Sequence, residues 1–213
     1  MNFKPYLLAC AVLFLTACSQ RFQDVNATMA EALFGADDAA LTAENIRKLP
    51  YASAYVRINE GPQIFMVLAF AEPNTQNGIM QYKWISSDRA VIITESGRIV
   101  KTIGLYGDNL ASISRQQQTD TSWQVTYDWM PKYRYGYKGI ALQTNRGSET
   151  VTTDLSTYNT QKLTETVTFD AIDGKLVNTY WKDIKTNNVI KSIEQLGPEM
   201  TTVEMTLLKV PTI

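Results

Sequence analysis

The segment Ala90-Val91-Ile92-Ile93-Thr94-Glu95-Ser96-Gly97-Arg98-Ile99-Val100-Lys101-Thr102-Ile103-Gly104-Leu105 decides the fold that we predict. Two runs rich in β-branched residues flank Ser96-Gly97, and β-branched side chains favour the pleated surface of a sheet. A short turn with glycine between two such runs is typical of an antiparallel hairpin, because glycine tolerates the positive φ that tight turns need. The segment therefore predicts two neighbouring antiparallel strands.

The same pattern continues on both sides of this hairpin, from Tyr51 to the end of the sequence. Short apolar or alternating runs are separated by turn residues, for example Arg146-Gly147 and Asp173-Gly174. We count about eleven strands, and so many antiparallel strands in one sheet tend to curl, split or close. The predicted fold class is all-β: an antiparallel meander that curves into a half-barrel or a two-layer sandwich.

Two short helices are predicted ahead of the strands. Apolar residues at helical spacing place one face of a helix over residues 21–34, which ends before Gly35; they are Phe22, Val25, Met29 and Leu33. A second helix is expected from the N-cap Thr42 to Lys48, because Pro50 disfavours helical geometry just before it. The first helix either packs on the domain or acts as a spacer or partner-binding helix beside a membrane.

The N-terminus has the plan of an export signal. One cation, Lys4, precedes an apolar run of about half the ~20 residues that cross a bilayer, and small residues follow it. The sequence Leu15-Thr16-Ala17-Cys18 resembles the lipobox of bacterial lipoproteins, which implies cleavage before Cys18 and lipidation of its thiol and amine. Ser19 at the next position implies sorting to the outer membrane. We therefore predict a signal peptide at 1–17, a lipidated N-terminus and helical segment at 18–50, and a single β domain at 51–213.

Composition excludes several classes of chemistry. The sequence has no histidine, which removes Ser-His-Asp and Cys-His catalysis and the common zinc sites. Its two cysteines, Cys10 and Cys18, both belong to the export segment, so the β domain has no thiol or disulfide. The net charge of −1 offers no field for nucleic acid. We expect no metal, no cofactor and no nucleic-acid partner.

A family resemblance rests on the segments Leu49–Ser53, Val67–Ala69, Trp84–Asp88 and Thr94–Leu105, the last followed by Asp108-Asn109-Leu110. With the lipobox, these segments resemble the group 4 capsule polysaccharide lipoprotein family, known as GfcB or YjbF. The resemblance implies an outer-membrane lipoprotein encoded with capsule or exopolysaccharide assembly genes. It implies a process and specifies no reaction.

A segment rich in aromatic residues is the main candidate for contact with a glycan or a partner. Within the aromatic segment (residues 129–138), the rings are Trp129, Tyr133, Tyr135 and Tyr137, and the cations are Lys132, Arg134 and Lys138. Aromatic faces stack on the apolar faces of sugars, and cations bind acidic sugars. The three tyrosines would share one face if the chain were extended. Alternatively, the aromatic residues fold over the end of the core.

Arg98 is a further candidate, either for a structural ion pair with Asp88 or Glu95 or for an anionic saccharide. Our leading hypothesis is a non-enzymatic outer-membrane lipoprotein that binds export-machinery proteins or the glycan during polysaccharide assembly, export or attachment. One alternative is a polysaccharide-modifying enzyme, which would need two carboxylates converging in a cleft. The other is a lipid or lipoprotein carrier, which would need a continuous apolar cavity.

Overall fold

The computed structural model describes residues 37–211, and almost all of them are in or between β-strands. Their elements are α3 (Ala43–Lys48), β1 (Ser53–Ile58), β2 (Gln63–Pro73), β3 (Met80–Ser86), β4 (Val91–Glu95), β5 (Arg98–Ile103), β6 (Asn109–Thr119), β7 (Ser122–Met130), β8 (Arg134–Thr152), β9 (Thr157–Phe169), the 3-10 helix η1 (Asp170–Ile172), β10 (Gly174–Asp183), β11 (Val189–Gln195) and β12 (Thr202–Lys209). The lipobox and the predicted helix 21–34 lie outside these residues. In residues 37–211, no helix has the length and apolar character needed to cross a membrane.

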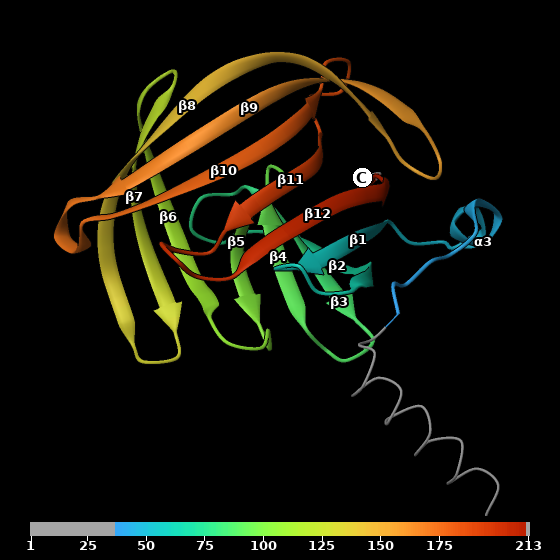
Figure 1. Cartoon of the computed structure of the whole chain (residues 1–213), viewed down its shortest axis with the longest axis horizontal. Helices are drawn as coiled ribbons and strands as arrows, with labels where there is room; N and C mark the ends of the chain where they lie inside the picture. Colours follow the sequence, from blue (N-terminus) through green and yellow to red (C-terminus); the bar gives the residue numbers. More distant parts are fainter. Residues whose placement is uncertain (1–36, 212–213) are drawn as a thin grey trace, which may run out of the picture. The chain divides into compact units, whose positions relative to one another are not determined.

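All twelve strands form one antiparallel sheet, as predicted for the fold class (Figure 1). The order is β5-β4-β3-β2-β1-β12-β11-β10-β9-β8-β7-β6, so every pairing joins strands that are consecutive in sequence except the pairing of β1 with β12. Short connections favour this up-and-down arrangement, and the twist of so wide a sheet curls it into a nearly closed barrel. The count of about eleven was therefore close to the twelve observed.

The gap in the barrel lies between β5 and β6, which are consecutive in sequence but occupy the two edges of the sheet. Side chains link these edges. The Leu110 amide donates to Thr102 Oγ1 at 2.9 Å, and the Asn109 carboxamide exchanges hydrogen bonds with the backbone N–H and C=O of Leu105. These bonds satisfy edge groups that would otherwise be open to another strand.

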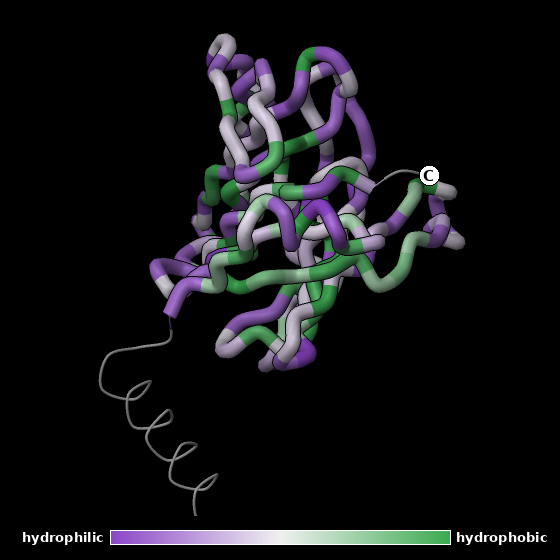
Figure 2. Tube along the Cα trace, turned by 90° about the vertical axis from the view of Figure 1, so that its right-hand side faces the viewer, coloured by the Kyte–Doolittle hydropathy of each residue, from purple (hydrophilic) through white to green (hydrophobic). Residues whose placement is uncertain are grey.

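The inner face of the sheet buries the main hydrophobic core. Figure 2 shows hydrophobic and hydrophilic residues interspersed along the chain, and burial alternates residue by residue along strands such as β7 and β11, as a sheet with one buried face requires. Four aromatic rings pack together in this core: Tyr127, Trp129, Tyr137 and Phe169. Trp129 Nε1 donates to the Leu196 carbonyl at 2.5 Å, which satisfies the polar atom of this buried ring.

Two local predictions had different outcomes. The helix after Thr42 is confirmed, and Thr42 Oγ1 accepts a hydrogen bond from the Asn45 amide at 3.3 Å. The predicted turn at Arg146-Gly147 is wrong, because these residues form an irregularity inside the single long strand β8. Gly147, at φ +94°, fits a bulge as readily as a turn, and the true turn lies between Thr152 and Thr157.

Candidate functional site

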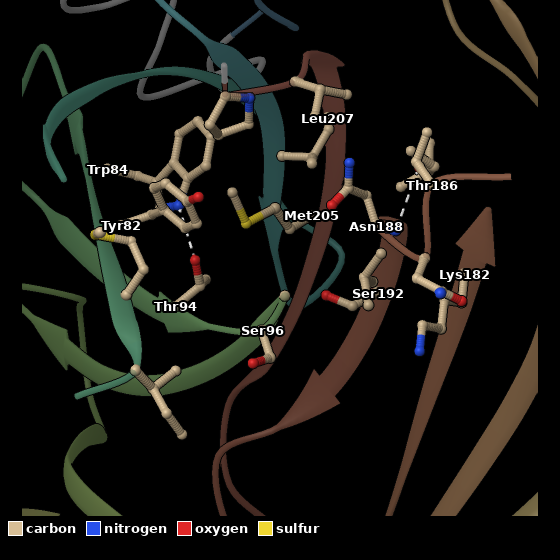
Figure 3. A pocket seen from close by; sticks show the side chains of 18 residues that line it. Tyr82, Trp84, Thr94, Ser96, Lys182, Thr186, Asn188, Ser192, Met205 and Leu207 are labelled. Atoms are coloured by element: carbon tan, nitrogen blue, oxygen red, sulfur yellow. Dashed lines mark hydrogen bonds between the residues drawn. The ribbon is translucent and has the colours of Figure 1, made fainter. Parts of the chain in front are cut away.

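A pocket of about 440 Å³ opens inside the curved sheet between strands β3–β4 and strands β10–β12. Its residues come from both halves of the sequence, because the pairing of β1 with β12 brings the two halves into one sheet. Figure 3 shows two chemically different sides. We call Tyr82, Trp84, Met205 and Leu207 the aromatic wall, and Lys182, Thr186, Asn188 and Ser192 the polar wall.

The aromatic wall is fixed by the alternation of β3. Residues two apart on a strand face the same side, so Tyr82 and Trp84 both face inward, with ring centroids 6.5 Å apart. Trp84 is buried, and its Nε1 donates to Thr94 Oγ1 at 3.1 Å. Tyr82 is half-buried, and desolvation raises the pKa of its phenol, which keeps the hydroxyl neutral at physiological pH. The wall therefore offers an uncharged ring surface.

The polar wall is built by the end of β10, the turn that follows it, and Ser192 on β11. Thr186 donates from its hydroxyl and its amide to Asp183 Oδ2, at 2.7 and 3.1 Å, and so fixes the turn. Lys182 is the one charged residue among those that line the pocket, and its side chain forms no ion pair within residues 37–211. The wall thus presents an unneutralised ammonium group beside neutral hydrogen-bonding groups.

Gly97 holds the β4–β5 turn against the polar side of the pocket. Its φ is +76°, and a Cβ built on it would lie 2.5 Å from the Val189 Cβ. Both the conformation and the close approach require glycine. This contact fixes the separation of β4 and β11 at the edge of the pocket.

Beside the pocket lies a cluster of ionisable side chains that we call the charged layer: the buried Glu165 and Glu194 and the partly buried Arg98 and Arg115. Glu165 is completely buried and accepts hydrogen bonds from Arg98 Nη1 and Arg115 Nη2, each at 2.7 Å. Burial alone would raise the pKa of Glu165, but the Arg115 hydrogen bonds and the charges of both arginines hold it below its ordinary value. Glu165 is therefore a carboxylate shared by two cations.

Glu194 has a different environment in the same layer. It accepts hydrogen bonds from Tyr180 Oη at 3.0 Å and from the Ile99 amide at 3.1 Å. Burial raises the pKa of Glu194 to about 7, and the attraction of Arg98 and these hydrogen bonds offsets the effect only in part. Because the Ile99 amide belongs to edge strand β5, this carboxylate occupies the place that a paired strand would take.

The cavity that the charged layer lines is small. The small cavity beside Arg98, Tyr127 and Glu194 has a volume of about 10 Å³, roughly the minimum for one water molecule. A pair of glycosidase carboxylates must be separated by a substrate and approached by water. Glu165 and Glu194 lie in no such cleft.

Arg98 forms an ion pair with a different residue from the two that the sequence suggested. Its partner is Glu165 on β9, and the proposed pairing with Asp88 or Glu95 is wrong. The reason is its direction: Arg98 points into the barrel, with its guanidinium carbon 4.3 Å from the Tyr180 ring centroid. Glu95 instead accepts from Asn74 and Gln81 on the rim.

The aromatic segment does not act as one surface. Trp129 is 1% exposed, with no open ring face for a glycan, and Tyr137 packs on it with centroids 5.0 Å apart. Lys132 and Tyr133 have positive φ, so the chain turns there and the three tyrosines do not share one face. Tyr133 and Tyr135 are 76% and 53% exposed, and a contact role for these two stays a prediction.

Sequence reasoning missed Glu165, Glu194 and Lys182. A signal existed for the two glutamates, because Glu165 alternates with Val167 and Phe169, and Glu194 alternates with Ile190 and Leu196. An acidic residue inside an alternating apolar face indicates a buried charge that needs a partner. No comparable signal marks Lys182, since its importance depends on strands distant in sequence.

Comparison with known proteins agrees with this architecture. The model of the family "Group 4 capsule polysaccharide lipoprotein gfcB, YjbF" matches residues 26–208. Two Escherichia coli K12 proteins are similar over 97% of this chain: the uncharacterized lipoprotein YjbF, 32% identical over 97% of its own length, and the uncharacterized lipoprotein GfcB, 29% identical over 98%.

A solved structure extends the similarity to the fold. The crystal structure of the hypothetical lipoprotein YmcC from Escherichia coli K12 superimposes with a TM-score of 0.69 at 28% identity, covering 87% of this chain and 96% of the other. The family match spans most of the sequence and the fold agrees with it. The chain therefore belongs to the group 4 capsule polysaccharide lipoprotein family.

Proposed function

We propose that the protein is an outer-membrane lipoprotein that acts without catalysis in the assembly, export or surface attachment of a capsule or exopolysaccharide, by binding the glycan. The observation that carries this proposal is the pocket, in which an aromatic wall faces a polar wall. A sugar ring has the matching amphipathic character, with apolar C–H faces and hydroxyl groups around its edge. Aromatic side chains stack on the apolar C–H faces, and polar side chains form hydrogen bonds with the hydroxyl groups.

The size and chemistry of the pocket favour glycan binding over the two alternatives. Its volume of about 440 Å³ lies within the range of roughly 300–1,000 Å³ for small-molecule sites. A lipid carrier would need apolar lining throughout, and the polar wall interrupts it. A carboxylate-dependent enzyme would need acids in the pocket, and no Asp or Glu is among the lining residues.

Membrane attachment in this proposal is through lipids on Cys18. Two or more acyl chains at one site give stable anchoring, whereas a single chain gives marginal binding. The β domain would then be held near the membrane, where an exported polymer passes. Proteins of the export machinery are the other expected binding partners.

Gene deletion with complementation tests the proposal. We expect loss or shortening of surface polysaccharide in the deletion strain, restoration by the wild-type gene, and reduced restoration by Cys18→Ala because the domain is no longer anchored. The measurement is surface polymer per cell, with immunoblots to match protein levels. Normal polymer in the deletion strain would contradict the function, and full rescue by Cys18→Ala would contradict the need for the anchor.

A further inference from the structure

We propose that the pocket recognises an acidic sugar: a pyranose ring that stacks on Tyr82 and carries a carboxylate bound by the Lys182 ammonium group. The inference rests on the proposed function and names the class of saccharide that it binds.

The charge of the pocket is that of Lys182 alone. No acidic residue lines the pocket, so the ammonium group has no counter-ion there. The neighbouring Asp183 is buried on the other face of β10 and accepts its hydrogen bonds from Thr186. A ligand carboxylate would supply the missing charge through a charge-assisted hydrogen bond, which is about twice as strong as a neutral one.

The pocket also holds neutral polar side chains with unused capacity. Trp84 is committed to Thr94, and Ser192 donates to Glu194. By contrast, Ser96 and Asn188 are exposed residues, and the Ser96 hydroxyl and the Asn188 carboxamide form no hydrogen bond with any residue in 37–211, so both are open to a ligand. With Lys182, they converge on the pocket from three places: the β4–β5 turn, the β10–β11 turn and the end of β10.

This arrangement distinguishes a sugar from a fatty acid, which also carries a carboxylate. An acyl chain in the pocket would offer Ser96 and Asn188 no hydrogen-bonding partner, and polar groups that it covered would lose their hydrogen bonds to water. Hydroxyl groups on a pyranose ring would pair with both. The polar groups therefore favour a hydroxylated ligand.

Two contacts fix the backbone that frames the polar side of the pocket. Gly97 packs directly against Val189, and Thr186 fixes the β10–β11 turn through Asp183. Groups that are already positioned lose little conformational entropy on binding. This rigidity permits a weak single-sugar contact to be selective, and repeated contacts along a polymer would add to it.

Isothermal titration of the mature lipoprotein in detergent micelles tests the inference. The probes are a disaccharide containing glucuronic acid and the same disaccharide with its carboxyl group reduced to the neutral glucose form. We expect at least tenfold tighter binding of the acidic form, and we expect Lys182→Gln to remove this preference. Lys175→Gln, on the outer face of the same strand, is the matched control and should leave the preference intact.

A second variant separates stacking from charge. Tyr82→Leu should weaken the binding of both disaccharides by a similar factor, whereas Lys182→Gln should weaken the binding of the acidic disaccharide only. Equal affinity for the two probes, an unchanged preference in Lys182→Gln, or displacement of the acidic probe by palmitate at a similar concentration would each overturn the inference. Circular dichroism and urea unfolding confirm that the variants fold.

The complemented deletion strain distinguishes failure of the inference from failure of the function. Reduced polymer with Lys182→Gln and normal polymer with Lys175→Gln would support the acidic-sugar site. Loss of polymer in the deletion with full restoration by Lys182→Gln would overturn the inference and leave the proposed function standing. Normal polymer in the deletion itself would overturn the proposed function.

Discussion

The charged layer and the pocket lie side by side in the same barrel, yet their polar groups are used in opposite ways. In the charged layer, Glu165 binds two arginines and Glu194 accepts from Tyr180 and the Ile99 amide. In the pocket, Lys182 has no counter-ion. The cavity that the charged layer lines has a volume of about 10 Å³, whereas the pocket has a volume of about 440 Å³.

This difference indicates which buried polar groups are structural. Charges that satisfy one another have no remaining capacity for a ligand, and they restrict how the strands can be arranged. Polar groups that keep unused hydrogen-bonding capacity or an unpaired charge beside a pocket can bind a ligand. The number of partners that a polar side chain has within the protein therefore indicates better than its residue type whether it stabilises the fold or can bind a ligand.

The largest effect is expected when the charged layer loses its shared acid. Glu165→Leu leaves Arg115 without its counter-ion and Arg98 with Glu194 alone, and we expect a loss of about 3–5 kcal/mol in the free energy of unfolding. Urea denaturation at constant m-value measures it. Glu204→Gln, which removes the more exposed pair with Lys191, is the control and should cost at most about 1 kcal/mol. Equal losses would mean that burial of the pair contributes nothing.

A pH dependence of stability should come from Glu194. Its pKa is raised from 4.5 to about 7, so between these values the native state holds more protons than the unfolded state. The free energy of unfolding must then fall as pH rises through this window, by about 3 kcal/mol if Glu194 acts alone. Glu165 has the opposite sign, because its lowered pKa makes stability fall with acidification below its ordinary value.

The measurement is urea unfolding at several pH values between 4.5 and 8. Glu194→Gln should flatten the slope between pH 5 and 7 and leave the decline at lower pH in place. The same slope in wild type and variant would show that another group titrates. Arg98 and Tyr180, which face Glu194, are not expected to change protonation in this range.

A smaller effect is expected where the two regions meet, at Gly97. Gly97→Ala places a methyl group against Val189 at a φ of +76°, and we expect a loss of about 1–3 kcal/mol together with weaker ligand binding. Gly107→Ala is the matched control, because Gly107 also has positive φ, +90°, but nothing lies within 4 Å of its added Cβ. Similar losses in both would assign the effect to backbone strain and not to the contact.

The smallest effect on stability is expected outside both regions. Tyr133→Ala with Tyr135→Ala removes two exposed rings, and surface changes of this kind usually alter stability by less than about 0.5 kcal/mol. If these tyrosines contact the glycan, retention on immobilised polysaccharide should fall while the unfolding curve stays in place. Unchanged retention with an intact fold would remove them as contacts and leave the pocket as the candidate.

Local pattern determined much of this protein. The β-branched runs around Ser96-Gly97 and the turn residues between runs predicted an antiparallel meander, because hairpins depend on neighbours in sequence. Thr42 predicted the start of its helix for the same reason. The lipobox at Cys18 and the family segments are likewise local, and they identified the family.

Long-range pairing decided the rest. Only the pairing of β1 with β12 brings Tyr82 opposite Lys182, and only closure of the barrel brings Arg98 to Glu165. Sequence alternation can show that a residue faces inward, but it does not show what lies across the interior. The inward-facing side chains were thus encoded locally, whereas their partners, their charge balance and the open pocket depended on the tertiary fold.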